Sequence, residues 1–381
     1  MSKWAGKYVI GVTGNIGTGK SVVRKMLEHL GAYGIDADAL GHRAIAKGAP
    51  GYKPVLETFG KYVLGPDEQI DRNKLSRIVF NDPDALPLLE KIVHPLVDQA
   101  LDLIIRRATQ RVIVIEAIKL IEANIHKNCN SLWVTYAPPE VQLARLIHNR
   151  HMTESEARQR MASHPPQERK MAAADVILKN VGPFEDTWNQ VLAAWKKNVP
   201  AAASVAPIFQ VVKTKAPQGD ITILRGNPRN SLDIAHFINR NQKANRSLQK
   251  DDIMAAFGEK AFLLLQLGDD LMGLIGWQVE NLIVRTTDIL LDPAISADQA
   301  LPPLISEMER ASSDLQCEAS LIFAPVDLAK LESVWKNLGY ERRTPQNLGI
   351  LAWQEAAIET MPPDTSLFFK QLRQDRILRP I

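Results

Sequence analysis

Residues 8–21 read Tyr8-Val9-Ile10-Gly11-Val12-Thr13-Gly14-Asn15-Ile16-Gly17-Thr18-Gly19-Lys20-Ser21, and this stretch decides the fold of the first half of the chain. A β-branched apolar run stops at Gly14, and the amphipathic run from Val22 to Leu30 predicts a helix. The loop between them has the pattern Gly-x-x-x-x-Gly-Lys-Ser of a phosphate-binding P-loop. Strand, glycine loop and helix in this order predict an α/β fold that holds a phosphate at the helix N-terminus.

The P-loop pattern also predicts which ligand is bound. Glycines let backbone N–H groups approach phosphate oxygens because no Cβ intervenes. Lys20 can reach the β- and γ-phosphates, and the Ser21 hydroxyl can ligate Mg²⁺. We therefore expect ATP and Mg²⁺ as cofactors. The predicted cofactor-binding residues of the loop are Gly14, Asn15, Ile16, Gly17, Thr18, Gly19, Lys20 and Ser21, with Ser21 as the metal ligand.

Length, charge and cysteine usage limit the class of protein. A chain of 381 residues is long for one core, so two domains are expected. The net charge is +3, and the basic excess in the first half is small and not clustered, which suits an anionic small substrate and not a nucleic acid. Two cysteines, Cys129 and Cys317, provide neither a disulfide framework nor a zinc site. No apolar run could span a bilayer and residues 1–12 lack a signal-peptide pattern, so we expect a cytoplasmic protein without a membrane partner.

Asp38 follows the segment that should be the next strand of the sheet. Ile35-Asp36-Ala37-Asp38 comes after the break at Gly31-Ala32-Tyr33-Gly34, and ligands of parallel sheets lie at the carboxyl ends of strands. Asp38 could therefore orient an attacking hydroxyl and accept its proton. It could equally be the N-cap of the helix predicted from Ala39 to Ala46. Position alone does not separate the two interpretations.

The remainder of the first half continues the α/β pattern. Residues 111–116 form an apolar run that ends at Glu116 and 131–136 form another, as expected for strands of a buried parallel sheet. Helices are predicted over 83–92 and 96–108, separated at His94-Pro95. Residues 142–170 are basic and helical, which fits either a lid that closes on the transferring phosphate or a solvated helical face.

The order of motifs resembles that of the dephospho-coenzyme A kinase family over about residues 7–198. The motifs that carry the resemblance are the P-loop, Gly34–Asp38, Asp71-Arg72 with Leu75, His94-Pro95, Leu120 with Glu122, Arg145, and Ala174-Asp175 with Asn180. The resemblance implies a P-loop kinase with a parallel sheet and a helical lid. It also implies phosphorylation of the ribose 3′-hydroxyl of dephospho-CoA by ATP.

The resemblance assigns roles residue by residue. It implies that Asp38 is the catalytic carboxylate, assisted by Lys20 and by Arg145, which would close over the transferring phosphoryl group. Asn180 joins the nucleotide-binding residues. The residues expected to bind the acceptor substrate are Asp36, Arg72, His94 and Glu122.

Two positions depart from the family's pattern and keep alternatives open. The family usually has Pro-Leu-Leu before the glutamate, whereas this chain has Ile118-Lys119-Leu120-Ile121-Glu122, and its usual lid glutamine is His164 here. Lys119 could contact phosphate, contact the substrate's acyl arm, or point to solvent. The alternatives for the first half are another nucleoside or nucleotide kinase and a nucleotide-sensing scaffold without catalysis.

The second half begins a different pattern. Residues 199–219 have a linker composition, so we expect a kinase-like domain over 1–198 and a separate α+β domain over 220–381. A hairpin is predicted from Ala261–Leu267 and Leu271–Val279, a strand over Leu282–Leu291, a helix over Ala297–Ser312, and a late strand over Leu348–Gln354.

This order of elements resembles the GNAT acetyltransferase fold. The region where that family holds a pyrophosphate, 292–303, has no glycine and contains Pro302 and Pro303, so we predict a binding or regulatory module without acetyltransferase activity. A bifunctional kinase and N-acetyltransferase is the alternative. The module leaves a homo-oligomer or a protein partner open.

Overall fold

The computed structural model describes residues 3–82, 84–150, 152–203, 212–216, 219–242 and 247–374. The described chain divides into two compact units. Residues 3–20 and 34–177 form the first unit, and residues 21–33 and 178–374 form the second. No helix of the described residues combines the length and apolarity needed to cross a membrane.

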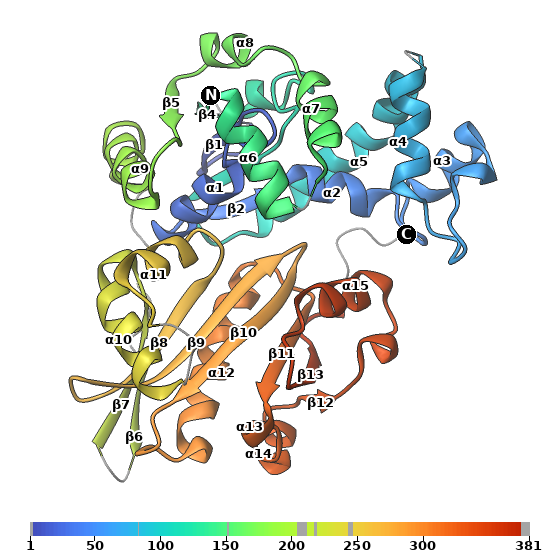
Figure 1. The fold of residues 1–381 in the computed structure, drawn as a ribbon. Coiled ribbons are helices and arrows are strands. Elements are labelled where there is room, and N and C mark those ends of the chain that lie inside the picture. The colour runs from blue at the N-terminus through green and yellow to red at the C-terminus, as the bar shows by residue number, and fades with distance from the viewer. Residues whose placement is uncertain are drawn as a thin grey trace. The chain divides into compact units, whose positions relative to one another are not determined.

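The first half of the chain alternates strands with helices, as the sequence predicts. Its elements are β1 (Tyr8–Thr13), α1 (Lys20–His29), β2 (Tyr33–Asp36), α2 (Ala37–Ala44), α3 (Tyr52–Phe59), α4 (Arg72–Asn81), α5 (Ala85–Arg107), β3 (Val112–Glu116), β4 (Ser131–Tyr136), α6 (Pro139–Arg150), α7 (Glu154–Ala162), α8 (Gln167–Ala172), β5 (Val176–Lys179) and α9 (Phe184–Asn198). Figure 1 shows these elements from blue to green.

A five-stranded sheet with the order β2-β3-β1-β4-β5 organises this half and confirms the predicted P-loop kinase architecture. The central strand β1 pairs in parallel with β3, where Val9 lies opposite Ile113, and with β4, where Gly11 lies opposite Leu132. Every residue of β3 is buried, which explains its continuous apolar run. Because the strands are parallel, the P-loop after β1 and the loop after β3 leave the same edge of the sheet.

Helix α5 corrects one expectation. The sequence predicts two helices that meet at His94-Pro95, but one helix of 23 residues runs through Pro95. Proline removes one backbone hydrogen bond from a helix interior. The helix continues because it buries a long face that includes Val97, Leu101 and Ile104, and this burial outweighs the missing bond.

The second half is a mixed α+β structure. Its elements are β6 (Val212–Ala216), β7 (Gly219–Arg225), α10 (Ser231–Asn241), α11 (Lys250–Ala256), β8 (Ala261–Leu267), β9 (Asp270–Glu280), β10 (Ile283–Leu291), α12 (Ala297–Asp314), β11 (Ala319–Pro325), α13 (Val326–Ala329), α14 (Glu332–Asn337), β12 (Glu341–Arg342), α15 (Leu351–Thr360) and β13 (Thr365–Gln371).

These strands form one eight-stranded sheet with the order β12-β13-β11-β10-β9-β8-β7-β6. The predicted hairpin of β8 and β9 is confirmed, and β10 and β11 pair in parallel. Helix α12 packs on one face through residues such as Leu304 and Met308. Helices α10 and α11 cover the other face around Phe262 and Leu264, as Figure 1 also shows. The predicted α+β class is therefore confirmed.

Helix α15 and strand β6 lie where the sequence predicts a strand and a linker. The late strand predicted over Leu348–Gln354 is wrong, because Leu351 begins α15 and the last strand of the chain is β13, which pairs with β11 and β12. Helix α15 buries Trp353, Ala356 and Ala357 against the sheet, so burial follows a helical spacing. Strand β6 lies within the predicted linker 199–219, of which 204–211 and 217–218 lie outside the described residues. The proposed domain boundaries stay a prediction.

Candidate active site

The P-loop is held in shape by residues of β4 and α6. Gly14 has a φ of +152°, and a Cβ there would lie 2.4 Å from Thr135 Oγ1. Gly17 has a φ of +76°, and its Cβ would lie 3.1 Å from the Gln142 carbonyl oxygen. Thr18 and Thr135 hydroxyls lie 2.7 Å apart. The loop therefore requires glycine both for its backbone conformation and for its close packing.

Lys20 is buried at the start of α1 and its ammonium points back into the loop. Lys20 is only 7% exposed, and its Nζ donates to the Asn15 carbonyl at 3.1 Å. Burial lowers the pKa of Lys20, although the carboxylates of Glu116 and Asp38 act in the opposite direction. Ser21, the predicted metal ligand, is the second residue of α1 and is exposed.

The structure separates the roles of the two aspartates after β2. Asp36 is the N-cap of α2 and accepts from the Ala39 N–H at 2.9 Å. Asp38 is not the cap. Its Oδ2 instead accepts from the Ile118 N–H at 2.9 Å, so Asp38 faces the loop after β3. Burial raises the pKa of Asp38, and the Ile118 N–H, Lys20 and Lys170 oppose that rise.

Four charged groups from different elements therefore share one buried region. Lys20 comes from α1, Asp38 from α2, Glu116 from the end of β3 and Lys170 from α8. Two cations and two anions offset one another, which makes their burial tolerable. The arrangement places a phosphate-binding loop beside a carboxylate that can accept a proton.

Arg145 and the segment before α8 reach the P-loop from the predicted lid. Arg145 Nη1 donates to the Gly17 carbonyl at 3.2 Å. Asn15 Nδ2 donates to the Pro165 carbonyl at 2.9 Å. The basic helical segment is thus not a solvated face throughout, because it contacts the loop at both ends.

The comparisons with known proteins agree with this site. A family model described as dephospho-CoA kinase matches residues 8–186. A dephospho-CoA kinase from Geobacter metallireducens is 41% identical over 194 residues, which are 50% of this chain and 96% of that protein. The chain belongs to the dephospho-CoA kinase family. Another relative of that description, from Aquifex aeolicus, is 40% identical over 189 residues, covering 49% of this chain and 96% of the relative.

The second half has its own structural neighbours. An acetyltransferase of the GNAT family from Staphylococcus aureus Mu50 is similar with a TM-score of 0.32 and 14% identity, covering 40% of this chain and 99% of that one.

Not all residues that the dephospho-CoA kinase resemblance assigns to the substrate lie in the buried cluster. Glu122 is exposed but borders that cluster, because it forms an ion pair with Lys170 at 3.5 Å. Arg72 is exposed at the start of α4. Burial lowers the pKa of His42 in α2, and the charge of Arg72 acts in the same direction. His94 lies in α5 beside Val93, against which Gly41 of α2 packs. Asn180 accepts from the Thr187 hydroxyl at 3.1 Å in the second unit.

The two departures from the kinase family's pattern have different surroundings. Lys119 Nζ pairs with Glu90 Oε1 of α5 at 2.9 Å and is half exposed. The pKa of His164 is lowered to about 4 by burial and by the charges of Lys170 and Lys20, so its ring is neutral at pH 7.

The sequence pointed to Glu116 only as the end of a strand, and it missed Lys170 as a site residue. Lys170 was one of many basic residues in 142–170, and no local pattern distinguishes it from its exposed neighbours. Its burial depends on where α8 packs, and that depends on tertiary contacts.

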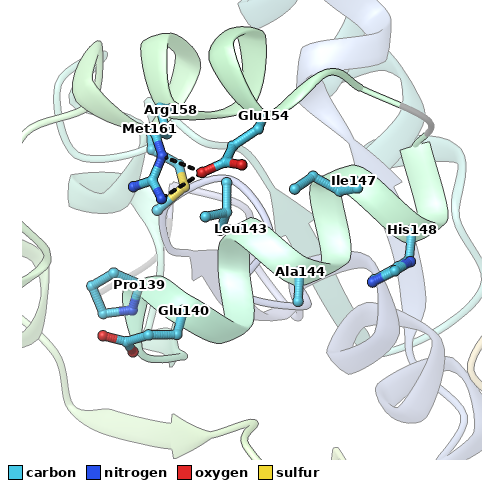
Figure 2. A pocket seen from close by; sticks show the side chains of 9 residues that line it. All are labelled: Pro139, Glu140, Leu143, Ala144, Ile147, His148, Glu154, Arg158 and Met161. Carbon is cyan, nitrogen blue, oxygen red and sulfur yellow. Dashed lines mark hydrogen bonds and ion pairs between the residues drawn. The ribbon is translucent and has the colours of Figure 1, made fainter.

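A cavity of about 390 Å³ opens between α6 and α7 (Figure 2). Leu143, Ile147 and Met161 give it an apolar floor, and Arg158 forms an ion pair with Glu154 at its edge at 2.7 Å. None of the predicted site residues lines it. Its floor residues also pack against a small apolar cluster that contains Ile16 of the P-loop.

Proposed function

We propose that the first half of the chain transfers the γ-phosphoryl group of ATP to the ribose 3′-hydroxyl of dephospho-CoA, giving CoA and ADP. The observation that carries the proposal is the buried cluster in which the P-loop lysine and Asp38 come together. Membership of the dephospho-CoA kinase family supports the choice of acceptor.

Asp38 is the group that accepts the hydroxyl proton in this proposal. The 3′-oxygen attacks the γ-phosphorus, the bond from that phosphorus to the β,γ-bridging oxygen breaks, and ADP leaves with the electron pair. Asp38 orients the hydroxyl and takes its proton. A carboxylate fixed by the Ile118 N–H suits this role because its direction is set before the acceptor binds.

The cations stabilise the charge that develops on the transferring group. Lys20 leaves the Asn15 carbonyl and binds the β- and γ-phosphates, and the amides of Gly14–Gly19 bind the same oxygens. Arg145, held at Gly17, is close enough to the loop to contact the transferring group. Asp36, Arg72, His94 and Glu122 remain the proposed contacts of the acceptor, and Asn180 that of the nucleotide.

Mg²⁺ fits the donor set of this site. The described residues contain no group of three or more His, Cys, Asp or Glu side chains that could hold a metal by themselves. Mg²⁺ commonly binds through substrate phosphates, water and few protein oxygens, and the Ser21 hydroxyl at the start of α1 is such a donor. When bound, the ion neutralises phosphate charge.

The acceptor can be tested against the alternative kinase. ADP release should be fast with dephospho-CoA and near background with adenosine or AMP, and mass spectrometry of the product should place the phosphate on the 3′-oxygen. A chain that phosphorylates adenosine or AMP and leaves dephospho-CoA unchanged would support the nucleoside or nucleotide kinase instead.

For the second half we propose a binding or regulatory role without acetyltransferase activity. The first turn of α12, where a pyrophosphate would bind, carries Asp298, and the preceding Asp292 pairs with Arg240 at 2.9 Å. Pro302 and Pro303 lie in the second turn, so they do not remove first-turn N–H donors as the sequence suggested. Calorimetric titration of the full chain, saturated with dephospho-CoA and ATP analogue, with acetyl-CoA should give no additional heat. Binding together with acetyl transfer would support the bifunctional alternative.

A further inference from the structure

Among the residues that the structure describes, Lys170 is the least exposed cation, and the proposed mechanism gives it no role. Its side chain is 2% exposed, although it belongs to a short helix in an otherwise basic and largely exposed segment. Burying an ammonium costs several kcal/mol unless it is paired and hydrogen-bonded. A lysine in this position therefore needs a compensating role.

The contacts of Lys170 lead directly to Asp38. Its Nζ donates to the Ile118 carbonyl and pairs with Glu122 at 3.5 Å. The same Ile118 donates its N–H to Asp38 Oδ2 at 2.9 Å, and the Thr13 hydroxyl donates to the Ile118 carbonyl at 3.1 Å. One residue of the loop after β3 is thus fixed on one side by Lys170 and on the other by Asp38.

We propose that Lys170 is a positioning residue for phosphoryl transfer, which holds Ile118 in place so that the Ile118 N–H keeps the Asp38 carboxylate directed at the acceptor hydroxyl. This inference rests on the proposed role of Asp38. It gives α8, the helix that carries Lys170, a role in the reaction.

The electrostatic surroundings of Asp38 give the inference a specific signature. The charged groups that face Asp38 are Lys20, Glu116 and Lys170, and of these Lys170 is held by the same loop residue as Asp38. Removing the Lys170 charge raises the pKa of Asp38 further, because one of the two cations that favour the carboxylate is lost. The acid limb of the kcat/KM profile should then move to higher pH.

The test compares Lys170→Met with Lys170→Arg in the full chain. Lys170→Met should lower kcat by roughly 10²-fold, the effect of a misplacement of about 1 Å, with a smaller change in the KM for ATP. Its acid limb should shift upward. Lys170→Arg keeps the charge and an N–H donor and should restore both the rate and the acid limb in large part. Lys127→Met, an exposed lysine in the same connection between β3 and β4, is the matched control and should match the wild type.

A double variant separates this inference from the proposed function. In the Asp38→Asn background, Lys170→Met should have little further effect on single-turnover rates, because its action passes through Asp38. An equal loss in both backgrounds, or an unshifted acid limb in Lys170→Met, would overturn the inference and leave the role of Asp38 intact. Full activity of Asp38→Asn would instead overturn the proposed function. Lys170→Gln replaces Lys170→Met if the latter does not fold, with the same expected shift.

Discussion

At the scale of single residues, the site depends on groups that are buried and mutually compensated. Arg145 is the lid residue whose position is most informative. Its guanidinium donates to the Gly17 carbonyl, so it lies beside the P-loop. A fixed cation near the transferring group stabilises charge in the transition state more than in the ground state.

Replacing Arg145 should therefore reduce kcat more than it weakens ATP binding. Arg145→Met should lower kcat by on the order of 10³-fold, as removal of an arginine of this kind does in related phosphoryl transfer. Steady-state kinetics measure the rate, and calorimetry measures ATP affinity. Arg106→Met, an arginine of α5 that is 72% exposed, is the control. A tenfold loss of ATP affinity with unchanged kcat would argue for a binding role only.

At the same scale, sequence reasoning succeeded where a residue type is required by local backbone geometry. Gly14 and Gly17 are fixed by close packing against Thr135 and Gln142, so the P-loop pattern was sufficient. Sequence reasoning failed for Lys170, because the burial of this lysine depends on contacts with Ile118 and Glu122, which are far from it in the sequence. The surroundings of Lys119, which departs from the family's pattern, could also be found only from the structure, where Lys119 pairs with Glu90.

At the scale of elements, the position of Asp38 depends on how α2 packs on α5. Gly41 lies in this contact: a Cβ on it would lie 3.4 Å from Val93 Cγ1 and 3.8 Å from Val97 Cγ2. These are ordinary van der Waals distances. A methyl group therefore fits, and a longer side chain does not.

Two substitutions at Gly41 test this packing in opposite directions. Gly41→Ala should raise the free energy of unfolding by about 0.5–1 kcal/mol, because glycine destabilises a helix interior by that amount relative to alanine. Gly41→Leu should lower it by about 1–3 kcal/mol through overpacking, and should lower kcat as α2 shifts. Urea unfolding and the ADP assay measure the two effects. A higher free energy of unfolding for Gly41→Leu than for the wild type would contradict the close packing of α2 on α5.

Elements were predicted well where burial follows a regular period. The strands β1, β3, β8 and β9 and the helix α12 agree with the sequence pattern. The break at His94-Pro95 was predicted from local chemistry, but the apolar face of α5 continues across it. The strand predicted near Leu348 failed because a short apolar run does not distinguish a strand from a helix.

At the scale of the whole molecule, the second unit contains the greater part of α1. The His29 ring lies 5.2 Å from that of Phe257, and its Nε2 contacts the Phe257 carbonyl at 2.7 Å. The Tyr33 hydroxyl donates to the Leu315 carbonyl at 2.9 Å. The helix after the P-loop therefore shares a core with the second half, which the sequence could not predict from its linker composition.

His29 makes this contact sensitive to acid. Burial lowers the pKa of His29 to about 4, and the charge of Arg225 acts in the same direction. Between pH 6.5 and 4 the unfolded chain binds a proton that the folded chain does not, so stability is lost as the pH falls through that range. Glu28, with a pKa lowered to about 2, loses its contribution below pH 4.5.

The variant His29→Gln should remove part of this pH dependence. Because His164 also has a pKa of about 4, the measured quantity is the difference between variant and wild type. As the pH falls from 6.5 to 4, the free energy of unfolding of the wild type should drop by up to about 3 kcal/mol more than that of His29→Gln. Urea unfolding at several pH values measures this difference. His148→Gln, an exposed histidine of α6, should follow the wild type. If the free energy of unfolding depended on pH in the same way for all three proteins, the pKa of His29 would not be lowered in the folded chain.

The central claim is that Asp38 accepts the proton of the acceptor hydroxyl, and one measurement tests it most directly. Release of ADP with saturating ATP and dephospho-CoA is compared for wild type, Asp38→Asn and Asp98→Asn, an exposed aspartate of α5. The account predicts a loss in kcat of roughly 10²–10⁴-fold for Asp38→Asn with ATP affinity retained, and no loss for Asp98→Asn. A wild-type rate in Asp38→Asn would contradict it.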